Sequence, residues 1–349
     1  MMRAMKRLLR IFIILFFAFS IVYAIGGLGD HQISELPVLR NVIEKPVEPF
    51  TFVMVGDVML GRTVRNRMRA SGNDLPFVNV GPIFADADAV VANLEGPITT
   101  LDAPDERVSP EQPYSMRFAF DPVVAEVLRD AGVTHVSLAN NHAGDQGVQG
   151  KEDTRTNLAA AGVEYFGAPW KLDVGTVAHV RPEGHDVALI GIDATIAPPN
   201  LTQLSREIES FGTSTHIVVM MHWGDEYQPV HNTTQETIAH TLIDAGVDAV
   251  IGSHPHVVQD IEVYNGAPIF YSLGNFIFDQ YWNADVRSGL ALRITHDEMG
   301  ERYQLVPIDG NHAQPKLMEE PARQALLDAL AARSQSELAE SIKAGLLVI

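Results

Sequence analysis

The sequence has 349 residues, of which 46% are hydrophobic, and this is enough apolar material for one large folded domain or two. Its formal net charge is −19 and its body contains no basic stripe. This balance excludes nucleic acid as the expected partner, because phosphate binding requires clustered Lys and Arg side chains. The sequence contains no cysteine, which excludes disulfides and thiolate metal sites.

The first 29 residues have the pattern of an export signal. Four basic residues lie within the first ten positions, and an apolar run over 11–25 follows them. The run is slightly shorter than the roughly 20 residues that span a bilayer, and residues 26–29 extend it. We expect residues 1–29 to form a signal-anchor helix that crosses the cell membrane once and holds the body on the extracytoplasmic side, either periplasmic or extracellular. Cleavage after Ala24 is the alternative.

A linker and an α/β domain follow the expected anchor. Residues 30–49 are polar and contain three prolines, which is typical of a spacer. Short apolar runs then alternate with helical segments, as expected for parallel strands that are buried on both faces. These strands are expected at 52–55, 88–92, 134–138, 187–192, 217–221 and 248–251, with helices at 121–130, 150–161 and 234–245.

The last third of the sequence is richer in β-structure. A strand is expected at 268–272, and a hairpin pairs 290–295 with 303–308 around Met299-Gly300. A helix is expected at 322–333, and an amphipathic stretch runs from Gln335 to the end. We therefore expect a folded domain over 50–312 and a helical packing tail over 313–349.

Polar side chains follow five of the expected strands. They are Asp57, Glu95, Asn141 with His142, His222, and His254 with His256. In α/β sheets ligands collect at the carboxyl ends of the strands, and imidazoles combined with carboxylates suit Mn, Fe or Zn. The set therefore predicts a site for one or two divalent metal ions. Taken singly, Asp57 is better explained as a helix cap and each histidine as a hydrogen-bonded polar residue.

The segment His254-Pro255-His256 carries two histidines around one proline. Residues two apart in an extended chain point the same way, and proline biases the residue before it towards the extended region. We therefore expect an extended segment that aims both imidazoles at one point.

Six motifs in order resemble those of the CapA family of poly-gamma-glutamate capsule biosynthesis proteins. They are 56–62 (GDVMLGR), 93–96 (NLEG), 140–142 (NNH), 222–226 (HWGDE), 252–256 (GSHPH) and 271–276 (YSLGNF). The resemblance covers about 52–308. It implies a fold similar to calcineurin-like metallophosphoesterases, which is a four-layer α-β-β-α sandwich. It also implies an outward-facing, membrane-anchored protein that makes, exports or anchors an anionic polyglutamate.

The resemblance also implies roles for single residues. Metal ligands are expected at Asp57, Glu95, Asn141, His222, His254 and His256, and His142 is the expected catalytic proton donor. Two positions depart from the phosphoesterase pattern: Met59 stands where that pattern has a histidine, and Glu95 stands where it has a bridging aspartate. A thioether is a poor ligand for a hard divalent ion, so one metal position is a ligand short.

Arg62 and Arg117 are candidates to pair with substrate carboxylates, and an ordinary ion pair is the alternative for each. Asn275 and Asp279 are expected to support the site from behind. Three functions remain open. The first is a metal-dependent hydrolase or transferase in capsule formation. The second is a non-catalytic scaffold of a polymer-export complex, and the third is a periplasmic metallophosphoesterase.

Overall fold

The computed structural model describes residues 49–101, 116–169, 175–181, 186–212, 215–297 and 300–349, and the compact unit that contains them begins at Pro49. The expected anchor at 1–29 and nearly all of the expected linker lie outside these residues. Within the described part of the chain, every helix is too short or too polar to cross a bilayer.

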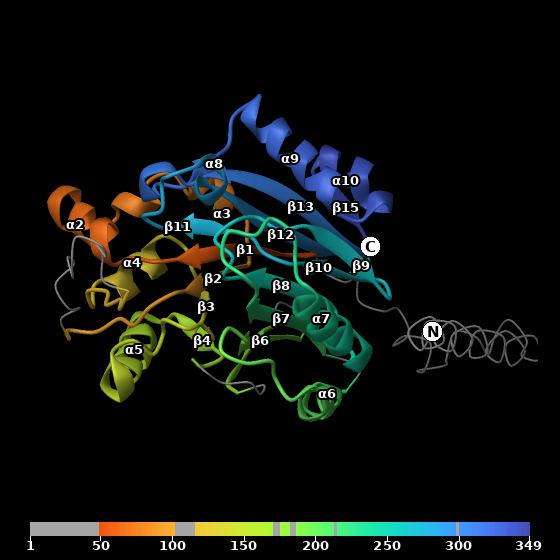
Figure 1. The fold of residues 1–349 in the computed structure, drawn as a ribbon. Coiled ribbons are helices and arrows are strands. Elements are labelled where there is room, and N and C mark those ends of the chain that lie inside the picture. The colour runs from red at the N-terminus through yellow and green to blue at the C-terminus, as the bar shows by residue number, and fades with distance from the viewer. Residues whose placement is uncertain (1–48, 102–115, 170–174, 182–185, 213–214, 298–299) are drawn as a thin grey trace, which may run out of the picture. The chain divides into compact units, whose positions relative to one another are not determined.

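Two β-sheets form the centre of this unit (Figure 1). The first has the order β14-β13-β12-β1-β2-β3-β4, and β11 and β15 pair additionally with β1 and β13. Its strands are β1 (Phe50–Val58), β2 (Ala89–Leu94), β3 (His135–Ser137), β4 (Glu164–Phe166), β11 (Asn275–Ile277), β12 (Ser288–Asp297), β13 (Gly300–Asp309), β14 (Lys316–Leu317) and β15 (Leu346–Val348). The strands β1 to β4 are parallel, whereas β12 and β13 form the antiparallel hairpin that the sequence predicts.

The second sheet has the order β5-β6-β7-β8-β10-β9. Its strands are β5 (Val177–Val180), β6 (Val187–Asp193), β7 (His216–His222), β8 (Ala249–Ser253), β9 (Ile261–Tyr264) and β10 (Ala267–Phe270). The four inner strands are parallel and the two edge strands are antiparallel. The carboxyl ends of the parallel strands therefore lie at one end of each sheet.

Helices cover the outer face of each sheet, which gives four layers. On the first sheet they are α2 (Arg62–Ser71), α3 (Gly81–Phe84), α4 (Val124–Asp130) and α5 (Gly147–Ala161). On the second they are α6 (Leu201–Glu209) and α7 (Thr233–Ala245). The mixed α/β class and the two sheets predicted from the sequence are confirmed.

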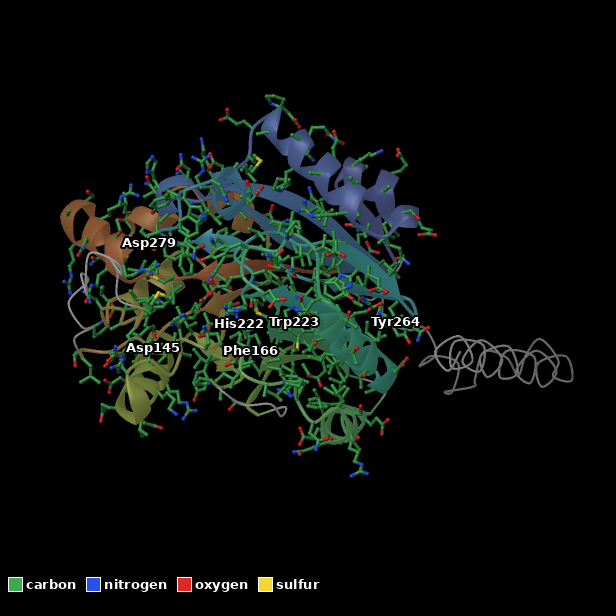
Figure 2. All side chains as sticks on the ribbon, viewed as in Figure 1. Asp145, Phe166, His222, Trp223, Tyr264 and Asp279 are labelled. Atoms are coloured by element: carbon green, nitrogen blue, oxygen red, sulfur yellow. The ribbon has the colours of Figure 1, made fainter. Side chains whose placement is uncertain are left out.

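The apolar residues of the strands contribute to three hydrophobic cores, one between the two sheets and one between each sheet and its helices. In β1, Phe52 and Met54 point between the sheets, whereas Val53 and Val55 point towards the helices. Successive strand residues face opposite sides, so a strand covered on both sides needs a continuous apolar run. Phe166 fills the space between the sheets, and Trp223 packs on the outer side of the second sheet (Figure 2). Burying each such side chain contributes about 1.5–3 kcal/mol.

Helix α7 illustrates how local sequence sets the boundaries. The Asn232 side chain accepts hydrogen bonds from the backbone at Thr234 and Gln235, and the Gln235 side chain bonds back to Asn232. At the other end Gly246 takes a left-handed conformation with φ 117°, which ends the helix as the sequence predicts. By contrast α4 begins at Val124, not at Asp121, because the residues before it form a turn in which the amide of Val124 donates to the backbone oxygen of Asp121 at 2.9 Å.

The C-terminal segment differs from the expected helical tail. Helices α9 (Ala322–Arg333) and α10 (Ala339–Ala344) are present, but the chain ends in strand β15, which pairs with β13. Leu327, Leu330 and Ile342 belong to the same core as the facing sides of the two sheets. The expectation of a helical tail up to the last residue was wrong, because the edge of β13 offers backbone partners that a local pattern does not reveal. Short helices at Leu75–Phe77, Ala284–Arg287 (α8), Asn311–Ala313 and Ser336–Leu338 complete the described elements.

Candidate metal centre

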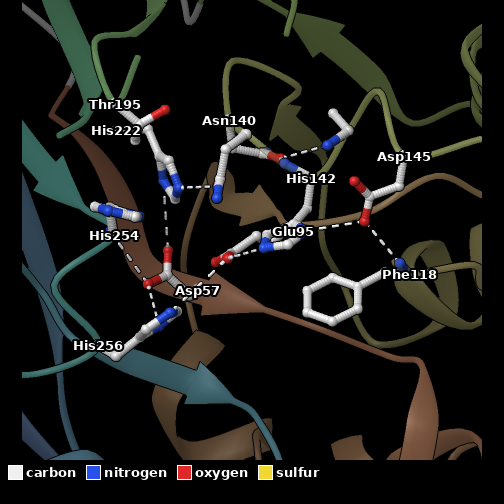
Figure 3. A network of polar contacts seen from close by, with 12 residues as sticks. Asp57, Glu95, Phe118, Asn140, His142, Asp145, Thr195, His222, His254 and His256 are labelled. Atoms are coloured by element: carbon white, nitrogen blue, oxygen red, sulfur yellow. Dashed lines mark hydrogen bonds and ion pairs between the residues drawn. The ribbon is translucent and has the colours of Figure 1, made fainter. Parts of the chain in front are cut away.

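Strand ends from both sheets meet at one place, which Figure 3 shows from close by. Asp57 lies near the end of β1, and Glu95 directly follows β2. From the second sheet come His222, the last residue of β7, and the loop after β8 that carries His254 and His256. A Cβ at Gly56 would lie 1.8 Å from the backbone oxygen of Gly274, so only glycine lets β1 approach this turn.

Asp57, Glu95 and His256 form a buried group that could hold a metal ion. One ligand atom from each lies within 4.8 Å of the others, and all three residues are buried. Nδ1 of His256 lies 3.3 Å from Oδ2 of Asp57, and its Nε2 lies 4.0 Å from Oε1 of Glu95. Oδ1 of Asn275 accepts a hydrogen bond from the same Nδ1 at 3.0 Å, which fixes the plane of the ring from behind.

Glu95 is the most informative member of the group. Its side chain is fully buried, and neither carboxylate oxygen has a hydrogen-bond partner among the described residues. Burial, and secondly the charge of Asp57, raise the pKa of Glu95 well above its ordinary value. Burying an ionised carboxylate without a partner costs several kcal/mol, and a bound cation would be the partner that its oxygens lack. The residues present therefore fit a divalent metal.

A second set of donors lies beside this group. Nε2 of His222 is 2.9 Å from Oδ1 of Asn141, and Nδ1 of His222 is 4.0 Å from Oδ1 of Asp57. These neighbouring imidazole and amide donors would be close enough to hold one ion together. Burial, and then the neighbouring imidazoles, lower the pKa of His222 well below its ordinary value. The ring is therefore neutral, as a metal ligand must be.

The loop with His254 and His256 is not extended, and the sequence-based expectation of its conformation was wrong. Both histidines have left-handed backbones, with φ of 94° and 59°. The amide of His254 donates to Oδ2 of Asp57 at 3.3 Å, so a contact distant in sequence stabilises a conformation that local preferences disfavour. Such strain is found at functional sites and costs about 1–3 kcal/mol per residue. Nδ1 of His254 is buried without a hydrogen-bond partner within the described residues.

His142 is held at the edge of the same centre. Its Nδ1 lies 2.8 Å from Oδ2 of Asp145, which also accepts from the amide of Phe118 at 2.7 Å. The Phe118 ring stacks on the imidazole with a centroid distance of 4.1 Å. Nε2 of His142 then faces Glu95, 4.0 Å from Oε1. Because a carboxylate can only accept, Nδ1 carries a hydrogen and Nε2 is the atom that takes up or releases a proton.

The two arginines selected from the sequence lie in different settings. The guanidinium of Arg62 pairs with Asp279 and lies over the ring of Phe118, 4.8 Å from its centroid. Burial and the charge of Asp57 raise the pKa of Glu95, and the positive charge of Arg62 partly opposes that rise, so the guanidinium acts on the centre. Arg117 instead donates to the backbone oxygen of Asp145, with Nε at 3.0 Å. It therefore braces the turn that carries the partner of His142.

Met59 does not contribute to the polar centre. Its side chain is fully buried in the core between the first sheet and its helices, and its sulfur accepts from the amide of Gly61 at 3.1 Å. The methionine is therefore a packing residue at the position where the phosphoesterase pattern has a ligand.

Sequence reasoning did not select several residues that shape the site. Asn93 donates to Oδ1 of Asp57 at 2.8 Å, and Asn140 donates to Asn93 at 3.0 Å. Ser253 contacts Nδ1 of His222 at 2.9 Å. Asn93 and Asn140 lie in the same motifs as selected residues. Asp145 follows His142 by three positions, and this turn-like spacing is the signal that would have identified Asp145. Asn275, which contacts His256, and Asp279, which pairs with Arg62, lie behind the site as expected.

Comparison with known proteins agrees with the resemblance in the motifs. A family model described as bacterial capsule synthesis protein PGA_cap matches residues 51–280. The capsule biosynthesis protein CapA of Bacillus anthracis is 32% identical over 288 residues, which is 77% of this chain and 69% of that protein. The PGA biosynthesis protein CapA of Bacillus subtilis is 31% identical over 321 residues, or 87% of this chain and 82% of that protein.

A more distant relative has a name of the same kind. A probable polyglutamine synthesis accessory protein of Mycobacterium tuberculosis is 30% identical over 220 residues, which is 55% of this chain and 56% of that protein. The resemblance to CapA proteins is thus confirmed by matches that span most of the folded unit. The chain belongs to the bacterial capsule synthesis protein family PGA_cap.

Proposed function

We propose that this protein acts in the synthesis, export or anchoring of a poly-gamma-glutamate capsule, and that its buried centre is a divalent-metal-dependent hydrolase or transferase site. The observation that carries the catalytic part is Glu95, whose two buried oxygens lack hydrogen-bond partners beside Asp57 and His256. The names of the Bacillus relatives support the part concerned with the capsule.

The proposed ligands form two neighbouring groups. Asp57, Glu95 and His256 form one, and Asn141, His222 and His254 form the other. Carboxylate, imidazole and amide donors without a thiolate suit Mn, Fe or Zn, and one or two ions fit the set. When bound, such an ion would supply a Lewis acid and an activated water.

His142 is the proposed catalytic residue of the protein itself. The Asp145 carboxylate holds Nδ1, and Phe118 fixes the ring plane, so Nε2 faces Glu95 in a fixed position. A protonated Nε2 can hand its proton to a leaving group, and the neutral ring can then take one back from water.

Arg62 is the proposed contact for a substrate carboxylate or phosphate. Its guanidinium is held between Asp279 and two aromatic rings, those of Phe118 and Phe278, and its side chain is 12% exposed. A planar guanidinium held in place recognises an anion with little loss of freedom. Arg117 is a weaker proposal for the same role, because its donors already meet the Asp145 backbone oxygen.

The cellular setting also belongs to the proposal. We place the body outside the cytoplasm, held by a single membrane helix at residues 1–29. Its partners there would be the anionic polymer or the complex that makes it. The basic residues before the apolar run and the proline-containing linker support this setting.

A non-catalytic scaffold is the second candidate, and Met59 favours it. A side chain buried in the core cannot complete a metal position, so one half of the centre has lost a ligand that the phosphoesterase pattern contains. In this role the fold would serve the export complex without chemistry.

Variants introduced into a capsule-forming cell separate the two candidates. We expect His254→Ala to lower both metal content and capsule, whereas His240→Ala, a histidine paired with Glu262 outside the centre, leaves both unchanged. The double variant Asp57→Asn, His222→Ala should fail to restore a capsule. Full restoration by the double variant, with its metal lost, would establish the scaffold. An unchanged metal content and capsule in His254→Ala would contradict the metal site itself.

A further inference from the structure

Two aromatic side chains are exposed beside the metal centre. Tyr227 is 41% exposed and Trp282 is 62% exposed, and their rings meet edge to face with centroids 5.5 Å apart. Tyr227 lies between β7 and α7, and Trp282 lies between β11 and α8. The two rings therefore come from different segments and meet at the surface.

A chain of polar contacts connects this pair to a proposed metal ligand. The side-chain amide of Gln280 donates to the Tyr227 hydroxyl at 3.2 Å, and Gln280 accepts from Asn275 at 3.0 Å. Asn275 in turn contacts Nδ1 of His256 at 3.0 Å. The Tyr227 and His256 rings themselves have centroids 6.0 Å apart. Tyr227 therefore forms part of the wall of the centre, and Trp282 packs against it at the surface.

The backbone also holds Tyr227 in place. Its φ of 64° is unusual for a residue other than glycine, and its amide donates to the backbone oxygen of Pro255 at 2.8 Å. A strained conformation persists only where the surrounding structure enforces it. The fold thus fixes an exposed ring in one position next to the loop that carries both histidines.

The charges around the pair are mainly negative. Burial first, and then the charge of Glu226 and a hydrogen bond with it, raise the pKa of Tyr227. Glu226 is exposed and directly precedes Tyr227 in the chain, so a carboxylate stands beside the aromatic pair. Arg62 acts on Tyr227 in the opposite sense, but Asp279 is its ion-pair partner.

We propose that Tyr227, Trp282 and Glu226 form a binding subsite for an organic ammonium group at the rim of the metal centre. The face of an aromatic ring is electronegative and attracts a cation, and a nearby carboxylate strengthens that attraction. An amine-bearing acceptor or chain end would be held there, next to the reacting groups. This inference goes beyond the proposed function and does not require any metal to be bound.

Titration of the purified full chain with choline tests the subsite, with 3,3-dimethylbutan-1-ol as the neutral molecule of the same shape. Calorimetry or ligand-observed NMR should show that choline binds about tenfold more tightly than the alcohol. Trp282→Ala and Glu226→Gln should each weaken choline binding by about three- to thirtyfold. Val148→Ala, which changes a residue 73% exposed on α5, should have no effect.

Three results would overturn the proposal. Equal affinity for choline and the alcohol would mean a plain apolar patch. Binding of N-acetylglucosamine but not choline would mean a sugar platform. Choline binding that survives both substitutions would place the cation elsewhere. Metal content measured on the same samples keeps the two questions apart, because Trp282→Ala should retain its metal whether or not the centre is catalytic.

Discussion

Two clusters of histidine and carboxylate side chains lie at opposite ends of strand β7. His222 ends the strand inside the metal centre, and His216 begins it about 20 Å away. We call the second set the distal cluster, and its members are His216, Asp248, His296, Glu301 and Tyr303. Nε2 of His216 lies 3.1 Å from Oε1 of Glu301, and Nδ1 of His296 lies 3.3 Å from the same oxygen. The Tyr303 hydroxyl donates to the other carboxylate oxygen.

Glu95 is fully buried and the side chain of Glu301 is 16% exposed, but the two glutamates differ above all in their hydrogen-bond donors. Burial acts to raise the pKa of Glu301, but bonds and charges from His296 and His216 outweigh it, so the pKa is lowered. Glu95 has no such donors, and its pKa is raised. A carboxylate whose oxygens are satisfied stabilises the fold, whereas an unsatisfied one marks a place that needs a cation.

Replacing Glu95 should have the largest effect on the metal centre. We expect Glu95→Gln to weaken binding of Mn, Fe or Zn at least about a hundredfold. Loss of a residue that only supports a ligand typically lowers metal affinity about 10–100-fold, and this variant removes a direct ligand. Titration calorimetry or competition with a chelator measures this. The variant should fold normally, since a neutral amide is easier to bury than an unpaired charge. Unchanged affinity would show that Glu95 is not a ligand.

Loss of the residue behind His256 should have the next largest effect. Asn275→Ala removes the contact to Nδ1 of the imidazole, and we expect metal affinity to fall about 10–100-fold. Asn157→Ala, which loses hydrogen bonds to the backbone oxygens of Ile98 and Asp153 and to none of the proposed ligands, serves as the control and should bind metal like the wild type. If both variants bound metal equally well, the hydrogen bond would have no role in orienting the ring.

The distal cluster should respond in the opposite manner. Glu301→Gln should lower the free energy of unfolding by about 2 kcal/mol at neutral pH and leave metal binding unchanged, because it removes charge-assisted bonds. Since the folded-state pKa of Glu301 is lowered, this contribution is present above its ordinary pKa of 4.5 and is lost as the pH falls through the lowered value. Chemical denaturation at several pH values checks both parts. A loss of metal in this variant would contradict the separation of the two clusters.

The smallest predicted effect is on how the free energy of unfolding of the metal-free protein depends on pH. The folded-state pKa of Glu95 is raised, so between 4.5 and that higher value the folded chain binds more protons than the unfolded chain. Stability therefore falls as the pH rises through this window, by up to about 1.4 kcal/mol per pH unit. Glu95→Gln should remove this part of the slope. Parallel unfolding curves for the two proteins over this range would show that Glu95 titrates as an ordinary exposed carboxyl.

The sequence predicts the parts of the fold that rest on local patterns. The apolar runs at 217–221 and 248–251 became β7 and β8, because a strand covered on both faces needs apolar residues on both. The polar residues after these runs also converge, because parallel strands end at the same edge. Both conclusions require only the alternation of side chains and the direction of the chain.

Long-range contacts determine what the sequence could not predict. The left-handed backbones of His254 and His256 are stabilised by hydrogen bonds from this loop to Asp57 and Tyr227, which are both distant in sequence. Strand β15 exists because β13 has a free edge. Whether a carboxylate finds donors, as Glu301 does and Glu95 does not, depends on which segments meet, and the two glutamates cannot be distinguished from their neighbours in sequence.

Metal stoichiometry is the measurement that tests the central claim most directly. The full chain and its Glu95→Gln variant would each be loaded with Mn, Fe or Zn and desalted, and the ions retained per chain would be counted by mass spectrometry. We predict one or two tightly held ions in the wild type and fewer in the variant. One ion would fit a centre in which Met59 has removed a ligand, and two would mean that other donors replace it. No retained ion in the wild type would contradict the account and leave the scaffold as the function of this protein.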